Sequence, residues 1–392
     1  MKRIVVVGDL SSTNLGDPLL THCCKYIVEK VIKDSEVPVV LFDIAGRESV
    51  VAPTASSSLS SQNIKSTLLE SVKSDIKSFV KWYVKEKKNF CERLLLAGVD
   101  ETIFVVAGGA LLSSSVFYAL RLHKIVRVAK KIGGKVIFNS VGIEKSIHNF
   151  GLAKYIVRDF LKRNEVVAFS TRDHIEDIPY LTKRSEFYKQ TPDPGLFASE
   201  AYNVNRKDSQ LIGLSVISYQ AYRSVIQNDK RAEKVTPDYL ISYWSSIIGH
   251  LQKMNLDFRI LTNGGKADYE MAKRLVAALN LDESQYLLSL PQSPFELVNQ
   301  ISMFRMIIAH RLHACIISSS LNIPIIPLIW SDKVKAFAEM LGNHFAMWPE
   351  MNEIANFDKV ITKSLDVKVS TEFLKDEIYK YMNDSLKLCE IQ

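Results

Sequence analysis

Two cationic side chains follow an apolar segment in the sequence Ile307-Ile308-Ala309-His310-Arg311-Leu312-His313. Arg311 offers a planar guanidinium that can bind a phosphate or carboxylate through two hydrogen bonds, and His313 can exchange a proton near neutral pH. A helix that starts here would add a dipole that favours an anion. We predict that Arg311 binds an anionic substrate and that His313 is the catalytic acid or base. An ion pair at the helix start with a structural histidine is the alternative, and His310 is expected to be structural.

Other polar positions in the second half of the chain are predicted to lie near this pair. Asn263 and Gly264 come directly after the apolar segment 257–262, where they would line the donor-binding side of a site. Lys333 follows the apolar segment 323–329 and could add a positive charge, although a solvated lysine explains it equally well. Glu296 completes a Ser-Pro-Phe-Glu sequence with the spacing of a capping box, so we interpret it as a structural acid.

The first half opens with an apolar segment followed by a polar loop that contains Asn14 and Asp17. The loop has neither the G-x-G-x-x-G spacing of dinucleotide sites nor a Walker sequence, so no dinucleotide or ATP site is inferred. Asp17 before Pro18 is typical of a helix cap with proline at the first helical position. Asn14 has no such structural explanation, and its amide could bind an acceptor hydroxyl or order the loop.

Gly108 and Gly109 end the apolar segment 102–107 and precede a helical pattern. Adjacent glycines allow close backbone approach and could present amide N–H groups to an anion or a sugar oxygen at the helix N-terminus, although a tight turn needs glycine anyway. Arg172 follows the segment 166–170 and is predicted to bind the donor. A pair with Asp173 or Glu176 is the alternative role for Arg172.

All these positions follow short β-branched segments, several of which precede a helical pattern. Such alternation predicts an α/β protein with βαβ units and parallel sheets, which bind ligands at the carboxyl ends of their strands. The expected strands are 3–7, 102–107, 135–140, 166–170, 211–216, 257–262, 306–309 and 323–328. A hinge is expected at 191–195, where prolines and a glycine interrupt the pattern. We therefore predict one Rossmann-like domain over 1–195, a second over 196–370, and a C-terminal helix over 371–392 that could cross back to the first domain.

Two further segments differ from this pattern. The serine-rich stretch 53–61 is expected to be a surface loop, with an active-site flap as the alternative. Over 65–93 a helical pattern places one apolar stripe beside lysines that recur every four residues; the stripe is Leu69, Val72, Ile76, Phe79 and Tyr83, and the lysines are Lys73, Lys77, Lys81 and Lys85. A surface helix packed on the sheet is the simpler interpretation. The alternative is contact with an anionic membrane or with the pyrophosphate of an acceptor.

Composition restricts the class of protein. Hydrophobic residues make up 47% and charged residues 24% of the 392 residues, which is typical of a globular protein large enough for two domains. A net charge of +7 favours anionic partners, but nucleic acid is not expected because no nucleic-acid-binding motif is present. Five cysteines without a C-x-x-C pair indicate free thiols and no metal site. Lacking a signal peptide or a long apolar segment, the protein is predicted to be cytoplasmic, with peripheral contact at the inner face of the membrane as an alternative.

Taken in order, these motifs resemble the polysaccharide pyruvyl transferase family. The resemblance rests on the N-x-G-D loop at 14–17, Ala107-Gly108-Gly109, Arg172-Asp173, Asp193-Pro194, Thr262-Asn263-Gly264 and Arg311-Leu312-His313, with Pro324 and Lys333 following. The order and spacing of the motifs carry it, rather than any single one. The chain departs from the family at Ala107, where a third glycine is common.

The resemblance implies two Rossmann-like domains facing each other across a cleft in the arrangement called GT-B, with the acceptor on the first and the donor on the second. It implies phosphoenolpyruvate as donor and a hexose of a cell-envelope polysaccharide or lipid-linked saccharide as acceptor. Arg311 would bind the donor's phosphate or carboxylate, His313 would be the general acid or base, and no metal or redox cofactor would be needed. A GT-B nucleotide-sugar glycosyltransferase is the alternative enzyme, and a non-catalytic glycan- or lipid-binding subunit is the alternative from another class.

Overall fold

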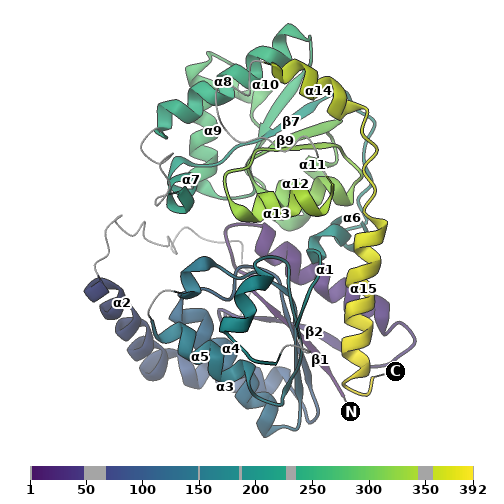
Figure 1. Ribbon diagram of the computed structural model, residues 1–392. Coiled ribbons are helices and arrows are strands. Elements are labelled where there is room, and N and C mark those ends of the chain that lie inside the picture. Colours follow the sequence, from purple (N-terminus) through teal and green to yellow (C-terminus); the bar gives the residue numbers. More distant parts are fainter. Residues whose placement is uncertain are drawn as a thin grey trace. The chain divides into compact units, whose positions relative to one another are not determined.

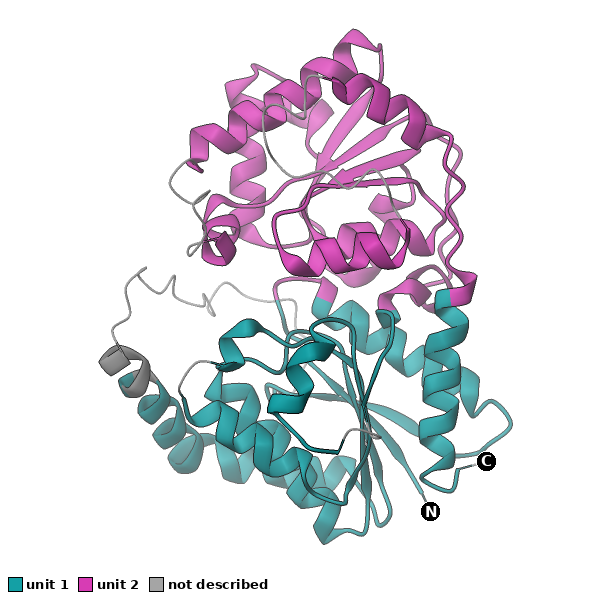
Figure 2. Ribbon diagram, viewed as in Figure 1, with its two compact units in different colours: residues 1–12, 17–194, 374–392 teal, residues 13–16, 195–373 magenta. Residues whose placement is uncertain are grey.

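The computed structural model describes residues 2–47, 68–148, 151–184, 188–226, 235–342 and 356–391. The chain divides into two compact units, shown in two colours in Figure 2. Unit 1 comprises Met1–Ser12, Asp17–Pro194 and Leu374–Gln392, and unit 2 comprises Thr13–Gly16 and Gly195–Phe373. The chain therefore passes between the units four times, after residues 12, 16, 194 and 373. The serine-rich segment 53–61 lies outside the described residues.

Unit 1 is built on a six-stranded parallel sheet with the strand order β2-β1-β3-β4-β5-β6. The strands are β1 (Ile4–Gly8), β2 (Val39–Asp43), β3 (Ile103–Ala107), β4 (Lys135–Val141), β5 (Val166–Thr171) and β6 (Tyr188–Gln190). The central strands β1 and β3 are buried along their whole length, because helices cover both faces of the sheet (Figure 1). Four of the six strands were predicted from the sequence, and the two that were missed, β2 and β6, are the edge strands.

The helices of unit 1 pack their apolar sides on this sheet. They are α1 (Gly16–Val31), α2 (Leu68–Lys81), the π-helical turn η1 (Trp82–Glu86), α3 (Lys87–Ala97), α4 (Val116–Lys131), α5 (Leu152–Leu161), the short 3-10 helices η2 (Lys145–His148) and η3 (Ile175–Tyr180), and the C-terminal α15 (Glu372–Lys387). Residues of α15 from Leu374 onward belong to unit 1, where the Tyr381 hydroxyl donates to the carbonyl oxygen of Phe138 at 2.8 Å. The chain thus returns at its end to the unit in which it begins.

Unit 2 is built on a four-stranded parallel sheet with the strand order β10-β9-β7-β8. Its strands are β7 (Ile212–Ser215), β8 (Phe258–Leu261), β9 (Met306–Ala309) and β10 (Ile325–Pro327). Its helices are η5 (Pro194–Phe197), α6 (Ala198–Ala201), α7 (Tyr219–Ile226), α8 (Pro237–Lys253), α9 (Lys266–Ala278), α10 (Glu283–Tyr286), α11 (Pro294–Ile301), α12 (Leu312–Ser320), α13 (Asp332–Met340) and α14 (Phe357–Leu365). All four strands were predicted, and both units confirm the α/β class with Rossmann-like parallel sheets.

The helix predicted over 65–93 is present from Leu68, but its buried side differs from the prediction. Residues 65–67 and the side chains of the first helical turn lie outside the described parts of the chain. Trp82, Phe90 and Leu94 are buried, and Phe79 of the predicted stripe packs against the same core, whereas the stripe residues Ile76 and Tyr83 are exposed. Since Trp82 faces the core and helical residues are about 100° apart, Ile76 lies roughly 120° around the helix from it. The π-helical turn η1 then shifts the face that follows.

The sequence predicted that the chain has no membrane-spanning segment and that its cysteines are free thiols. No helix in the described parts of the chain is long and apolar enough to cross a lipid bilayer. All five cysteines are free thiols, and four of them are buried. Burial raises the pKa of both the Cys24 and the Cys315 thiol to about 12, so neither is a reactive thiolate.

Candidate functional site

The carboxyl edge of the sheet in unit 2 gathers buried polar side chains. The neighbouring strands β8, β7 and β9 end at or just before Thr262-Asn263, Ser215 and His310, all of which are buried. The backbone N–H of His310 donates to the carbonyl oxygen of Ser215 at 3.1 Å, which continues the sheet pairing to its edge. Asn263 Nδ2 and Oδ1, Ser215 Oγ and Thr262 Oγ1 have no hydrogen-bond partner among the described residues. Buried polar atoms without partners point to a ligand or ordered water at this edge.

Arg311 lies at this edge as the residue that precedes α12, and its guanidinium is already held by a carboxylate. Nε and Nη2 of Arg311 donate to Oδ2 and Oδ1 of Asp268 at 2.7 and 2.6 Å. Asp268 is buried in the first turn of α9 and also accepts from the backbone N–H of Ser218 at 2.9 Å. The fork of Arg311 that the sequence assigned to a donor anion is therefore occupied by Asp268. Only its remaining face and its Nη1 group are left for an anion.

His313 is buried in the first turn of α12, where it packs against a glycine from the N-terminal loop. A Cβ atom added at Gly16 would lie 2.0 Å from Nδ1 of His313, so only glycine allows the backbone to pass the imidazole so closely. Gly16 belongs to the segment Thr13–Gly16, which the structure groups with unit 2. Asn14, expected from the sequence on the acceptor side of the first domain, therefore lies with the unit that carries Arg311 and His313.

The same loop is held by the turn after β8. The backbone N–H of Leu15 donates to the carbonyl oxygen of Asn263 at 3.0 Å. Gly264 has a φ of +95°, and a Cβ atom there would lie 2.6 Å from Cγ of Leu15. Asn263 and Gly264 thus act through their backbone to hold the loop beside His313, while the amide side chain of Asn263 stays buried at the strand end. Lys333 is half-buried in the first turn of α13.

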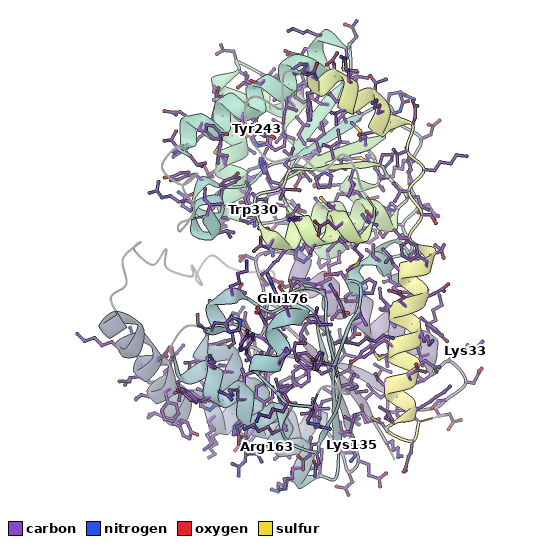
Figure 3. All side chains as sticks on the ribbon, viewed as in Figure 1. Lys33, Lys135, Arg163, Glu176, Tyr243 and Trp330 are labelled. Carbon is purple, nitrogen blue, oxygen red and sulfur yellow. The ribbon has the colours of Figure 1, made fainter. Side chains whose placement is uncertain are left out.

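His310 is structural, as the sequence analysis expected. Its imidazole is fully buried among Tyr222, Tyr243 and Trp244, with ring-centroid distances of 5.1 to 5.8 Å. The indole N–H of Trp330 donates to its carbonyl oxygen, and Figure 3 labels Trp330 and Tyr243 in this unit. Burial lowers the pKa of His310 to about 3, with a smaller contribution from the charge of Arg311. This histidine is therefore neutral at every pH at which the protein would work.

The carboxyl edge of the sheet in unit 1 has acidic side chains instead. Asp9 follows β1, and its Oδ2 accepts a hydrogen bond from the Tyr118 hydroxyl at 2.9 Å. Burial raises the pKa of Asp9, the Tyr118 hydrogen bond lowers it, and the nearby Asp43 carboxylate raises it, so that the net shift is upward. Asp43, at the end of β2, orders the loop after β1 by accepting from the Leu10 N–H at 3.2 Å and the Ser11 hydroxyl at 2.7 Å.

The glycine pair and Asp17 differ from their predicted positions. Gly108 and Gly109 both have positive φ, and a Cβ atom at Gly108 would lie 2.5 Å from Cβ of Leu20. However, α4 begins only at Val116, so the glycines do not form a helix N-terminus and the predicted anion site of that kind is wrong. They form a turn instead, in which the N–H of Gly142 donates to the carbonyl oxygen of Gly109 at 2.8 Å. Asp17 lies inside the first turn of α1 rather than at its cap, and its Oδ2 accepts from the Ser12 hydroxyl at 2.9 Å.

Arg172 is committed to carboxylates within unit 1. Its Nη1 lies 2.5 Å from Oδ2 of Asp193, and its Nε lies 3.7 Å from Oδ2 of Asp173. Burial alone would lower the pKa of Arg172, but Asp193 and Asp173 raise it above its ordinary value. The geometry favours the structural role over donor binding. The pairing partner is Asp193, while Glu176, one of the two partners suggested by the sequence, lies 3.2 Å from His174.

Sequence reasoning excluded one carboxylate correctly and overlooked others. Ser293 caps α11 by accepting from the N–H of Glu296, whose carboxylate in turn accepts from the N–H of Gln292, so Glu296 has the predicted structural role. Asp268 and Asp9 were missed. Asp268 does carry a local signal, because it is an acid in the first turn of the helix that follows the Asn263-Gly264 turn. Asp9 directly follows the first strand, which is also a recognisable ligand-binding position.

Comparisons with known proteins agree with this architecture. A family model described as polysaccharide pyruvyl transferase matches residues 14–332. No curated protein sequence matches the chain. Among solved structures, UDP-GlcNAc 2-epimerase from Methanocaldococcus jannaschii covers 100% of both chains at 12% identity and a TM-score of 0.54. The Neisseria meningitidis enzyme covers 100% of this chain and 99% of its own at 12% identity and a TM-score of 0.51. These likenesses establish the GT-B-like fold with two Rossmann-like domains.

Proposed function

Because this chain belongs to the polysaccharide pyruvyl transferase family, we propose that it transfers the enolpyruvyl group of phosphoenolpyruvate to a hexose. The product is a pyruvate ketal on a glycan or on a lipid-linked saccharide of the cell envelope. Family membership supports a transferase that acts in polysaccharide synthesis. The donor and the ketal chemistry are proposals that rest on one observation above all, which is the position of Arg311 and His313 together at the carboxyl edge of β9.

The chemistry requires proton transfer and anion binding. The methylene carbon of phosphoenolpyruvate gains a proton, one sugar hydroxyl attacks the adjacent carbon, and a second hydroxyl displaces phosphate and closes the ring. The two sugar hydroxyls release two protons in total. One offsets the proton gained by the new methyl group, and the other leaves with phosphate. His313 is the proposed general acid for carbon protonation, and Arg311 the proposed contact for the donor's phosphate or carboxylate. This sequence of steps calls for no redox chemistry, and we propose that no metal or cofactor takes part.

The remaining predicted residues keep proposed roles within this scheme. Lys333 supplies a further positive charge for the donor, and the Asn263 amide binds donor oxygens from the strand end. The acceptor is proposed to bind unit 1, where the second carboxylate oxygen of Asp9 and the Tyr118 phenol oxygen offer hydrogen-bond acceptors for vicinal hydroxyls. Gly108, Gly109 and Asp17 shape that edge. Buried free thiols support a reducing, cytoplasmic location.

The decisive experiment is an activity assay with defined substrates. The purified protein is incubated with phosphoenolpyruvate and saccharides that contain galactose, mannose or N-acetylmannosamine. We expect phosphate release together with a pyruvylated sugar detected by mass spectrometry. Folded protein that neither binds phosphoenolpyruvate by calorimetry nor acts on any acceptor would reject the proposal.

Nucleotide-sugar glycosyl transfer is the second candidate, since a structure with the same fold, the epimerase from Methanocaldococcus jannaschii, was solved with UDP-GlcNAc and UDP. Thermal-shift measurements separate the two functions. Stabilisation by phosphoenolpyruvate and not by UDP or GDP is expected for the pyruvyl transferase. The opposite pattern would favour the glycosyltransferase.

A further inference from the structure

The exposed side of α2 and η1 carries large apolar side chains among lysines. Ile76, Val80, Tyr83 and Val84 are 56%, 52%, 49% and 74% exposed. The lysines Lys73, Lys77, Lys85 and Lys88 are exposed on the same helical segment, which lies at the edge of unit 1 in Figure 1. We refer to these eight side chains as the lysine face. A helix that only packs on its own domain would bury its apolar residues and expose polar ones.

Two acidic side chains near the lysine face, Asp75 and Glu86, have partners within unit 1. Asp75 accepts a hydrogen bond from the backbone N–H of Leu152, in α5. Glu86 lies 2.5 Å from Nη2 of Arg121 and 2.9 Å from Nζ of Lys81. The Arg121 guanidinium in turn lies 3.5 Å from the ring centroid of Phe117 and 4.7 Å from that of Trp82, which holds the pair against the core. Asp75 and Glu86 therefore have partners in unit 1. Lys88 lies 4.0 Å from Glu92, so the charge of the lysine face rests mainly on Lys73, Lys77 and Lys85.

We propose that the lysine face docks on an anionic lipid bilayer. The lysines contact headgroup phosphates, and Ile76, Val80, Tyr83 and Val84 enter the boundary between headgroups and acyl chains. The positive charge of the lysine face favours an anionic partner. Its exposed aliphatic side chains favour a lipid bilayer over a soluble anionic protein, which would need only the ionic contacts. The inference is independent of the catalytic proposal, although a membrane-bound enzyme would meet a lipid-linked acceptor directly.

Vesicle binding by the full chain tests the proposal. The protein is sedimented with phosphatidylcholine vesicles that contain or lack phosphatidylglycerol. Binding is expected only to the phosphatidylglycerol vesicles, and it weakens as salt is raised. The double variant Lys73→Glu/Lys77→Glu should lose more than about tenfold in partitioning, since each lysine near an anionic surface contributes roughly a factor of five. Val84→Asn should lose affinity without changing the salt dependence.

Matched variants in unit 2 serve as controls. Lys359→Glu/Lys363→Glu makes the same charge change at the same spacing on two exposed lysines of α14, and Val225→Asn on α7 replaces a valine that is 49% exposed. Both controls should bind like the unaltered protein, and all four variants should keep its melting temperature. Equal binding to both kinds of vesicle, or equal losses in the two charge-reversed variants, overturns the proposal. Binding to polyglutamate without binding to vesicles also overturns it and assigns the face to an acidic protein.

Discussion

The carboxyl edges of the two sheets have the same architecture and different polar side chains. In unit 2 the edge carries Arg311 with its partner Asp268, the neutral His310, His313 and, after β10, the half-buried Lys333. In unit 1 it carries Asp9 and Asp43 beside the Tyr118 hydroxyl. Parallel sheets bind ligands at this edge in either case, so the side chains that follow each strand decide which ligand is suited.

This difference is consistent with the division of labour that we propose between the units. Cationic and amide groups suit an anionic donor, whereas carboxylates and a phenol suit the hydroxyl groups of a sugar, which both donate and accept hydrogen bonds. Two cations of unit 1 do not fit this contrast by residue type: Arg47, which lies near Asp9, and the buried Arg172. The charge of Arg172 is compensated within the unit by Asp193 and Asp173.

Replacing His313 should have the largest effect. Glutamine keeps much of the imidazole's size and one hydrogen-bonding group, but it cannot transfer a proton. We expect His313→Gln to reduce kcat by about 10² to 10⁴ while donor affinity changes little, as measured by phosphate release and calorimetry. His250→Gln on α8 is the control and should retain activity. If the kcat of His313→Gln stayed within tenfold of the original value, His313 could not be the general acid or base.

Breaking the Asp268–Arg311 pair should have the second largest effect. Asp268→Asn leaves a partly buried guanidinium without its carboxylate, which should lower the free energy of unfolding by about 3 kcal/mol in urea titrations. Donor affinity should also fall at temperatures where the variant is folded, because Arg311 loses its fixed orientation. Asp238→Asn, a change in the exposed first turn of α8, should alter stability by less than about 1 kcal/mol. Equal stability losses in the two variants would show that the pair has no special role.

The smallest effect concerns Asp9 in unit 1. Burial raises the pKa of this carboxyl, so its ionisation costs stability as the pH rises above the ordinary aspartate value. Asp9→Asn should therefore slightly raise the melting temperature at neutral pH, with no gain at strongly acidic pH, while kcat/KM for the acceptor falls.

In Tyr118→Phe the pKa of Asp9 should rise further, because the phenol that lowers it is gone. The acid limb of the pH–rate profile should therefore move to higher pH. Tyr155→Phe, an exposed change on α5, should leave the profile unchanged. A lower melting temperature in Asp9→Asn would contradict this account of the unit 1 edge.

Much of the fold follows from local sequence, because buried parallel strands are short apolar segments with clear ends. The central strands and all of unit 2's strands could be predicted in this way, whereas the half-exposed edge strand β2 and the three-residue β6 left weak signals. Arg311 and His313 could be identified because they follow a buried strand directly. Their surroundings could not be predicted, since Asp268 is 43 residues from Arg311 and Gly16 is almost 300 residues from His313 in the chain.

Three predictions differ from the structure for separate physical reasons. The glycine pair was assigned to a helix N-terminus because the pattern after it is apolar, but Leu112 pairs with Ile143 as an isolated β-bridge and delays the helix. The amphipathic stripe of α2 was judged by period alone, which cannot tell an apolar side that packs inward from one that faces solvent. For Arg172 the sequence suggested neighbouring partners, whereas its shorter ion pair is with Asp193, 21 residues further on.

The four crossings of the chain between the units have a practical consequence for dissecting the enzyme. A fragment that spans 195–373 would lack the segment Thr13–Gly16, including the Gly16 that packs against His313, and a fragment that ends at 194 would lack α15. Split or chimeric versions must therefore exchange non-contiguous segments. Gly16, which packs against the His313 imidazole, is joined by one peptide bond to Asp17 of unit 1. A displacement of Gly16 would therefore reach unit 1 along the backbone itself.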